Sequence, residues 1–159
     1  MPNQPQNRQA GAKRVAGLAL RTDNATEARA GGGKIPGLWE RYRREDWFGR
    51  LEELGAFGPP LGVYSAYGSD ATGSFQILAG REIPSSALVR PPLAEVSIPP
   101  GTYLVFESAG PLPGSVVSGW QAVWTYFGRP GGTAARAYTC DFEIYPSDHE
   151  VEIWVATLK

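Results

Sequence analysis

One order of secondary-structure elements occurs twice along this sequence, and it constrains the fold more than any other feature. Each copy runs strand, helix, strand, strand, judged from apolar spacing and from the turn-forming Gly and Pro between segments. The predicted ranges are 14–21, 36–54, 61–67 and 75–80, then 93–107 with a break at 99–101, 116–127, 137–145 and 151–158. Each unit alone leaves an apolar sheet face uncovered, and packing two units together buries it. The repeat predicts an α+β domain: a duplicated β-α-β-β unit, with two helices on one side of an antiparallel sheet and a central ligand cleft where the halves meet.

Both predicted helices carry tryptophans on their apolar faces. In the first, apolar residues recur every three or four positions, and Glu and Arg of mixed sign form the opposite, solvated face. The second has the same spacing and ends near Gly128. The apolar positions are Ile35, Leu38, Trp39, Tyr42, Trp47, Phe48, Leu51 and Leu54 in the first helix, and Val116, Val117, Trp120, Val123, Trp124 and Phe127 in the second.

The length and composition fit a single domain. A chain of 159 residues with 42% apolar residues can bury a core. Residues 1–13 are polar and lack periodicity, so we expect a flexible N-terminal tail before a domain spanning 14–159. The 15 basic and 16 acidic residues nearly balance, which argues against direct nucleic-acid binding. No apolar run approaches about 18 residues, which argues against a membrane span. The polar N-terminus and the single Cys140 predict a cytoplasmic protein.

Metal and cofactor chemistry find little support in the sequence. The chain has one histidine, His149, and one cysteine, Cys140, which do not make a ligand set for structural zinc. His149 lies in a predicted turn, and Cys140 alternates with apolar residues, which is typical of a buried thiol. We therefore expect no metal site and no cofactor.

The penultimate predicted strand offers a carboxylate among aromatic rings. Strand alternation places Glu143 and Tyr145 on one face and Phe142 and Ile144 on the other. The last strand alternates similarly, and we expect its aliphatic side to pack on helices while Trp154 shares the face of carboxylates and rings. Such a face is either simply solvated or lines a pocket for an organic cation, since ring faces and a carboxylate both attract positive charge.

Several short stretches resemble one protein family. They are residues 15–18 (VAGL), 21–22 (RT), 35–39 (IPGLW), 62–64 (GVY), 80–82 (GRE), 98–103 (IPPGTY), Phe106 with Gly110, 141–145 (DFEIY) and 151–154 (VEIW). In this order they resemble the GyrI-like effector-binding domain, the ligand-binding half of AraC-type and MerR-type multidrug-responsive regulators. The resemblance covers nearly all of residues 14–159 and implies a duplicated strand–helix–strand–strand fold. It also implies that Glu143 is the pocket carboxylate, and that the wall aromatics are Trp39, Tyr64, Tyr103, Trp124, Tyr145 and Trp154.

The resemblance leaves three functions open. The first is a stand-alone binding protein for hydrophobic or cationic aromatic ligands, similar to modules carried in mobile gene cassettes. Such a protein would act on transcription only through a separate regulator. The second is a hydrolase, like relatives that open strained cyclopropane electrophiles, with Glu143 as the catalytic base. The third is a protein inhibitor, as the gyrase-binding members suggest, although the balanced charge argues mildly against it. We expect the binding protein.

Overall fold

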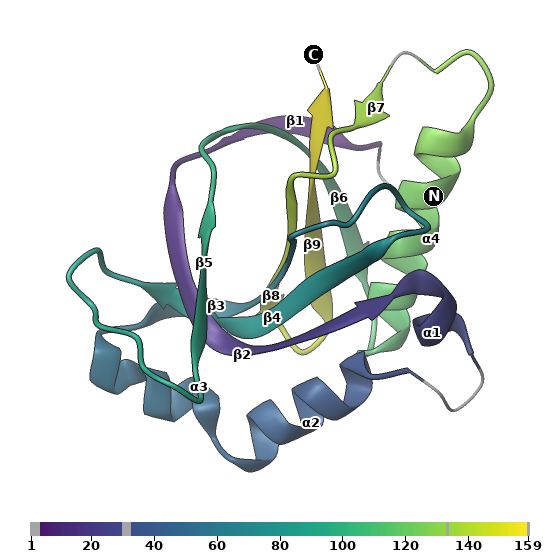
Figure 1. Cartoon of the computed structure of the whole chain (residues 1–159). Helices are drawn as coiled ribbons and strands as arrows, with labels where there is room; N and C mark the ends of the chain where they lie inside the picture. The colour runs from purple at the N-terminus through teal and green to yellow at the C-terminus, as the bar shows by residue number, and fades with distance from the viewer. Residues whose placement is uncertain (1–3, 30–32, 133, 159) are drawn as a thin grey trace.

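The computed structural model describes residues 4–29, 33–132 and 134–158. Its backbone is a strongly curled antiparallel sheet with the helices outside the curl (Figure 1). The predicted α+β class is confirmed. The strands are β1 (Gln6–Ala10), β2 (Lys13–Asp23), β3 (Phe57–Ser65), β4 (Ser74–Ile83), β5 (Ala94–Ile98), β6 (Gly101–Ala109), β7 (Ala135–Arg136), β8 (Cys140–Ser147) and β9 (Glu150–Leu158). The helices are α1 (Asn24–Ala28), α2 (Ile35–Arg44), α3 (Trp47–Arg50), the 3-10 turn η1 (Leu51–Leu54) and α4 (Gly114–Gly128). Within the described residues, no helix is both long and apolar enough to span a membrane.

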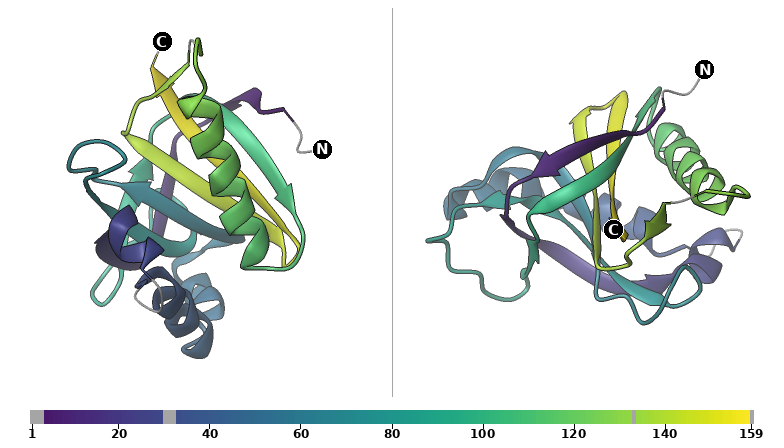
Figure 2. Two further views of the ribbon diagram at one scale, coloured as in Figure 1. Left: turned by 90° about the vertical axis from the view of Figure 1, so that its right-hand side faces the viewer. Right: turned by 90° about the horizontal axis from the view of Figure 1, so that it is seen from above.

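The strand order shows how two copies of one unit share the sheet. The order is β1-β6-β9-β8-β3-β4-β2-β5, and β7 pairs with β9. One half supplies β2, α2, β3 and β4, and the other supplies β6, α4, β8 and β9, so the predicted repeat is confirmed. The halves join where β3 pairs with β8. Helix α4 packs on β6 and β9, and α2 packs on β2 and β4, so the two helices flank this junction (Figure 2).

The N-terminal segment contains a strand instead of the flexible tail that the sequence predicted. Residues 6–10 form β1, which pairs with β6 of the second half, and residues 94–98 form β5, which pairs with β2 of the first half. Each half thus gives its leading strand to the other. The side chains of β1 are mostly exposed and polar, which is typical of an edge strand. The segment therefore lacks the apolar alternation from which a strand is predicted. An ion pair of 2.5 Å between Arg8 and Glu107 joins β1 to β6. Residues 1–3 of the predicted tail lie outside the described residues.

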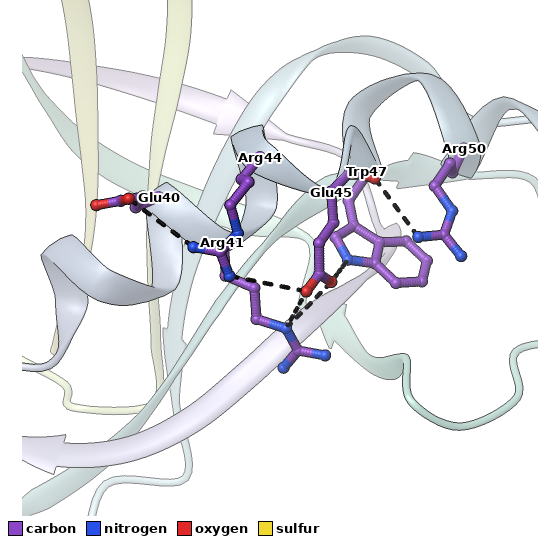
Figure 3. A network of polar contacts seen from close by, with 6 residues as sticks. All are labelled: Glu40, Arg41, Arg44, Glu45, Trp47 and Arg50. Atoms are coloured by element: carbon purple, nitrogen blue, oxygen red, sulfur yellow. Dashed lines mark hydrogen bonds and ion pairs between the residues drawn. The ribbon is translucent and has the colours of Figure 1, made fainter.

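The helix predicted over 36–54 is interrupted. Helix α2 ends before Glu45, and Asp46 adopts a left-handed conformation (φ 51°) before α3 begins. The Glu45 carboxylate accepts a hydrogen bond from Nε1 of Trp47 at 2.8 Å and pairs with Arg41 at 3.2 Å (Figure 3). The break shifts the apolar face, because the next apolar residue comes five positions after the last one of α2 instead of three or four.

The strand predicted over 137–145 also starts later than expected, at Cys140. Tyr138 has a positive φ of 53°, which interrupts the extended backbone between β7 and β8. The thiol of Cys140 is buried, as predicted, and burial raises its pKa to about 12, so it stays protonated and unreactive.

The sheet buries an apolar cluster on each face. The cluster on the side of the helices includes Leu18, Ile77, Phe106 and Ile153 of the sheet and Val123 of α4. The cluster on the opposite face includes Val15, Val63, Leu78 and Phe142. Helix α4 approaches β9 closely at Gly119, where a Cβ atom would lie 2.7 Å from Cδ1 of Ile153. The following residue, Trp120, is buried.

Candidate functional site

A buried carboxylate lies at the junction of the two halves. Glu143 of β8 is 1% exposed and pairs across the sheet with Gly62 of β3. Its side chain is on the sheet face that carries the helices, because it contacts Trp120 of α4 and lies beside Trp39 of α2. Both halves of the repeat therefore contribute to its surroundings.

Three neutral groups donate hydrogen bonds to this carboxylate. The hydroxyl of Tyr64 and the indole Nε1 of Trp120 both donate to Oε2, at 2.9 and 2.6 Å. The hydroxyl of Tyr145 donates to Oε1 at 2.5 Å. Within the described part of the chain, no ion pair includes Glu143. When ionised, the carboxylate is therefore solvated by these donors, with no cationic side chain paired to it in the described ranges.

Burial governs the protonation of this group. Loss of water raises the pKa of Glu143 above its ordinary value, and the hydrogen bonds from Tyr145, Trp120 and Tyr64 oppose that rise. Burial together with the charge of Glu143 raises the pKa of both tyrosines well above the ordinary value. Both hydroxyls therefore stay protonated near neutral pH and remain donors.

Aromatic rings surround the carboxylate on several sides. Trp39 meets Tyr145 edge to face, with ring centroids 5.3 Å apart. Tyr64 meets Trp120 in the same way at 5.1 Å, and it also contacts Phe75 at 5.4 Å. Trp39 and Tyr145 are half-buried, so they form the outer cover of the carboxylate. Edge-to-face contacts of this kind stabilise each pair by about 0.5–1.5 kcal/mol and fix the ring orientations.

Gly62 makes room for this arrangement. A Cβ atom at this position would lie 2.6 Å from Oε1 of Glu143 and 3.2 Å from Cζ2 of Trp39. Only glycine lets the carboxylate and the indole approach the backbone of β3 this closely.

A second buried carboxylate lies two residues away on the same strand face. Asp141 is 0% exposed and pairs with the buried guanidinium of Arg136 at 2.8 Å. It also accepts hydrogen bonds from the hydroxyl of Tyr67 and from the backbone N–H of Ala156. The charge of Asp141 is thus balanced within the protein.

The structure brings together four of the residues that the sequence singled out: Glu143, Tyr145, Trp39 and Tyr64. Trp124 lies one step further out. It is 47% exposed, and its ring centroid is 6.4 Å from that of Trp120.

Tyr103 and Trp154 are not beside Glu143. They pack with Phe142 on the opposite sheet face, where Trp154 stacks on Phe142 at 5.3 Å. The expectation that Trp154 shares the face of Glu143 is therefore wrong. The register of β8 and β9 decides this, because it pairs Glu143 with Ile153 and Phe142 with Trp154. Alternation within each strand was correct, but the relative register of the two strands was not visible in the sequence.

Sequence reasoning missed two members of the site, Trp120 and Gly62. The sequence places Trp120 on an apolar helix face but does not indicate its role in the site. The available signal was its spacing of four positions from Trp124, which brings two side chains together on a helix. Gly62 carried no signal by itself, because its role depends on the residue opposite it in β8. No cluster of three or more His, Cys, Asp or Glu side chains suited to a metal ion occurs among the described residues.

Solved structures share this architecture. An integron cassette protein from the mobile metagenome of Vibrio cholerae is 31% identical, with a TM-score of 0.82 over 99% of this chain and 97% of that one. SAV2435, solved bound to tetraphenylphosphonium, is 20% identical, with a TM-score of 0.77 over 98% and 94% of the two chains. A hydrolase encoded by lin2189 from Listeria innocua is 11% identical, with a TM-score of 0.53 over 99% and 93%. The last two show a shared fold only.

Comparison with curated protein sequences gives no significant match. The sequence model of one family, described as Cass2, integron-associated effector binding protein, matches residues 9–157. This match and the similar structures confirm the predicted resemblance to GyrI-like effector-binding domains. The chain belongs to the family of integron-associated effector binding proteins.

Proposed function

We propose that this effector-binding protein takes amphipathic organic cations that carry aromatic groups, and that Glu143 supplies the charge that selects them. The observation that carries the proposal is a buried carboxylate with three neutral donors and no cationic partner among the described residues. Burying a charge in this way is costly, and a cationic ligand is the partner that would offset the cost.

The surroundings of Glu143 suit a flat or branched aromatic cation. Four elements, α2, β3, α4 and β8, each place one aromatic ring around the carboxylate. The rings are Trp39, Tyr64, Trp120 and Tyr145. A cation facing such rings gains about 0.5–2 kcal/mol per ring. SAV2435, which shares the fold, binds tetraphenylphosphonium, and this supports the choice of ligand class.

Access to Glu143 requires movement of its outer cover. The carboxylate is 1% exposed, whereas Trp39 and Tyr145 are half-buried above it. Tyr145 contributes one of the three donors, so a cation that takes its place at Oε1 leaves two hydrogen bonds intact. We therefore assign Tyr145 and Trp39 as the residues that a ligand displaces, with Trp124 as an outer aromatic contact.

The test is calorimetric titration with ions of matched shape. Tetraphenylphosphonium and tetraphenylborate have nearly the same size and opposite charge, and triphenylphosphine oxide is neutral. We expect the wild type to bind the phosphonium and to reject the borate. Glu143→Gln keeps the side-chain shape, and we expect it to weaken phosphonium binding about 10- to 150-fold (~1.5–3 kcal/mol), with little effect on the neutral compound.

Two results would contradict the proposal. Equal loss of the charged and the neutral compound in Glu143→Gln would mean that this residue only shapes the site, and no loss of either would place the site elsewhere. Mass spectrometry of the recovered ligand separates binding from catalysis: an unchanged ligand supports a binding protein, and a product supports the hydrolase.

A further inference from the structure

Two buried carboxylates share one face of β8, and only one of them is balanced by a cation. Asp141 pairs with Arg136 at 2.8 Å, whereas Glu143 receives hydrogen bonds from neutral groups alone. The side chains of Asp141 and Arg136 are 0% and 6% exposed. When Glu143 is ionised, it adds one net negative charge to a pair that is neutral by itself.

Arg136 is close enough to act on a ligand held by Glu143. Its Cζ atom lies 5.6 Å from the ring centroid of Trp120, and Nε1 of Trp120 donates to Glu143 at 2.6 Å. One indole ring therefore separates the guanidinium from the carboxylate. Arg136 also lies 4.4 Å from the ring of Tyr138. The guanidinium of Arg136 and the carboxylate of Glu143 interact strongly across this indole ring, because the side chains between them are buried and exclude water.

We propose that Arg136 cancels the charge of Asp141, so that Glu143 supplies the single net negative charge that a ligand meets and the site favours monocations. The inference rests on the proposed function of Glu143 and adds the charge number of the ligand. A single ligand charge balances Glu143, whereas a second charge on the same aromatic body has no free carboxylate to pair with, because Asp141 is already paired with Arg136.

A pair of biaryl cations tests this directly. 1-Methyl-4-phenylpyridinium carries one charge, and 1,1′-dimethyl-4,4′-bipyridinium has a closely similar shape with two charges in the ring system. We expect the wild type to bind the monocation at least about tenfold more tightly. The size of the effect follows from Coulomb's law. Two unit charges about 10 Å apart, one on the protein and one on the ligand, change the binding constant about tenfold at an effective dielectric constant of about 20.

Variants then change the charge of the pair in both directions. Asp141→Asn leaves the guanidinium unpaired and permanently charged, so we expect the monocation preference to widen about tenfold further. Arg136→Gln removes the positive charge that balances Asp141, so we expect the preference for the monocation to narrow about tenfold. The double variant Arg136→Gln with Asp141→Asn removes both charges and serves as the packing control, with a preference within about twofold of the wild type. If one single variant fails to fold, the other still gives the sign of the effect.

The outcomes separate this inference from the function on which it rests. The role of Arg136 and Asp141 is overturned if the monocation preference of both single variants stays within twofold of the wild type. It is also overturned if the double variant shifts the preference as much as a single variant does. Either result stands even if Glu143→Gln still loses the monocation. If Glu143→Gln binds both ligands as well as the wild type does, the proposed function fails, and this inference fails with it.

Discussion

At the scale of a single residue, burial of the Glu143 carboxylate links its protonation to protein stability. Burial raises its pKa, so the folded protein holds this proton more tightly than the unfolded chain does. The stability contributed by the protonated form is fully present below the ordinary glutamate pKa and is lost as the pH rises through the raised value. The ionised carboxylate therefore makes the protein less stable near neutral pH than a neutral group of the same shape would.

Glu143→Gln tests this link. We expect the variant to be more stable than the wild type at pH 7.5, by ~1 kcal/mol or about 2–4 °C in melting temperature. The difference should shrink toward zero as the pH falls below about 4.3, where glutamate is protonated in both states. Thermal unfolding followed by circular dichroism across this pH range measures it. A difference that does not change with pH would show that the Glu143 charge carries no stability cost.

Gly62→Ala tests the close approach of Glu143 to β3. The added methyl group collides with Oε1 of Glu143 and with the ring of Trp39, so we expect a stability loss of ~1–3 kcal/mol and at least about tenfold weaker phosphonium binding. Gly37→Ala in α2 is the matched control, since a Cβ atom there meets no other atom within 4 Å. The account is contradicted if the two alanine variants behave alike.

At the scale of elements, the sequence predicted the existence of helices and strands better than their limits. Periodicity located the strands that became β2, β3, β4, β5, β6, β8 and β9, because half-buried strands and amphipathic helices leave different apolar patterns. It failed at β1, whose polar side chains face solvent, and at Asp46, where a left-handed residue divides one helical stretch into two. Both failures occur where backbone pairing or conformation is decided by contacts that lie outside the local pattern.

Removal of residues 1–11 tests the structural role of β1. The strand covers the edge of β6, buries Ala10, and places Arg8 in an ion pair with Glu107. We expect its loss to lower the melting temperature by about 5 °C or more, because the β6 hydrogen bonds and apolar contacts on that side are lost. An unchanged melting temperature would mean that the segment is a dispensable tail after all.

At the scale of the whole molecule, the two halves are interlocked and not merely adjacent. Strand β1 lies in the sheet of the second half, β5 lies in the sheet of the first, and β3 pairs with β8 at the junction. The repeat was readable from the sequence because it follows the order of elements. The exchange of leading strands and the register of β8 against β9 were not, because each depends on which distant strand a segment pairs with.

The interlock predicts a single unfolding unit. We expect amides of β4 in the first half and of β9 in the second to exchange through one global opening with the same denaturant dependence. Hydrogen exchange measured at increasing denaturant provides the comparison. Separate slopes for β4 and β9 would show that the halves unfold independently, against the strand exchange seen here.

The central claim is that the charge of Glu143 receives a cationic ligand, and the pH dependence of tetraphenylphosphonium binding tests it most directly. Burial raises the pKa of Glu143 in the free protein, and a bound cation lowers it, so binding releases a proton between the two values. Calorimetry from pH 4.5 to 7.5, in buffers of different ionisation enthalpy, measures both affinity and proton release. The account predicts that affinity falls and a proton is released as the pH drops through the raised pKa, and that Glu143→Gln shows neither effect. Wild-type affinity that does not change with pH, or the same pH dependence in Glu143→Gln, would contradict it.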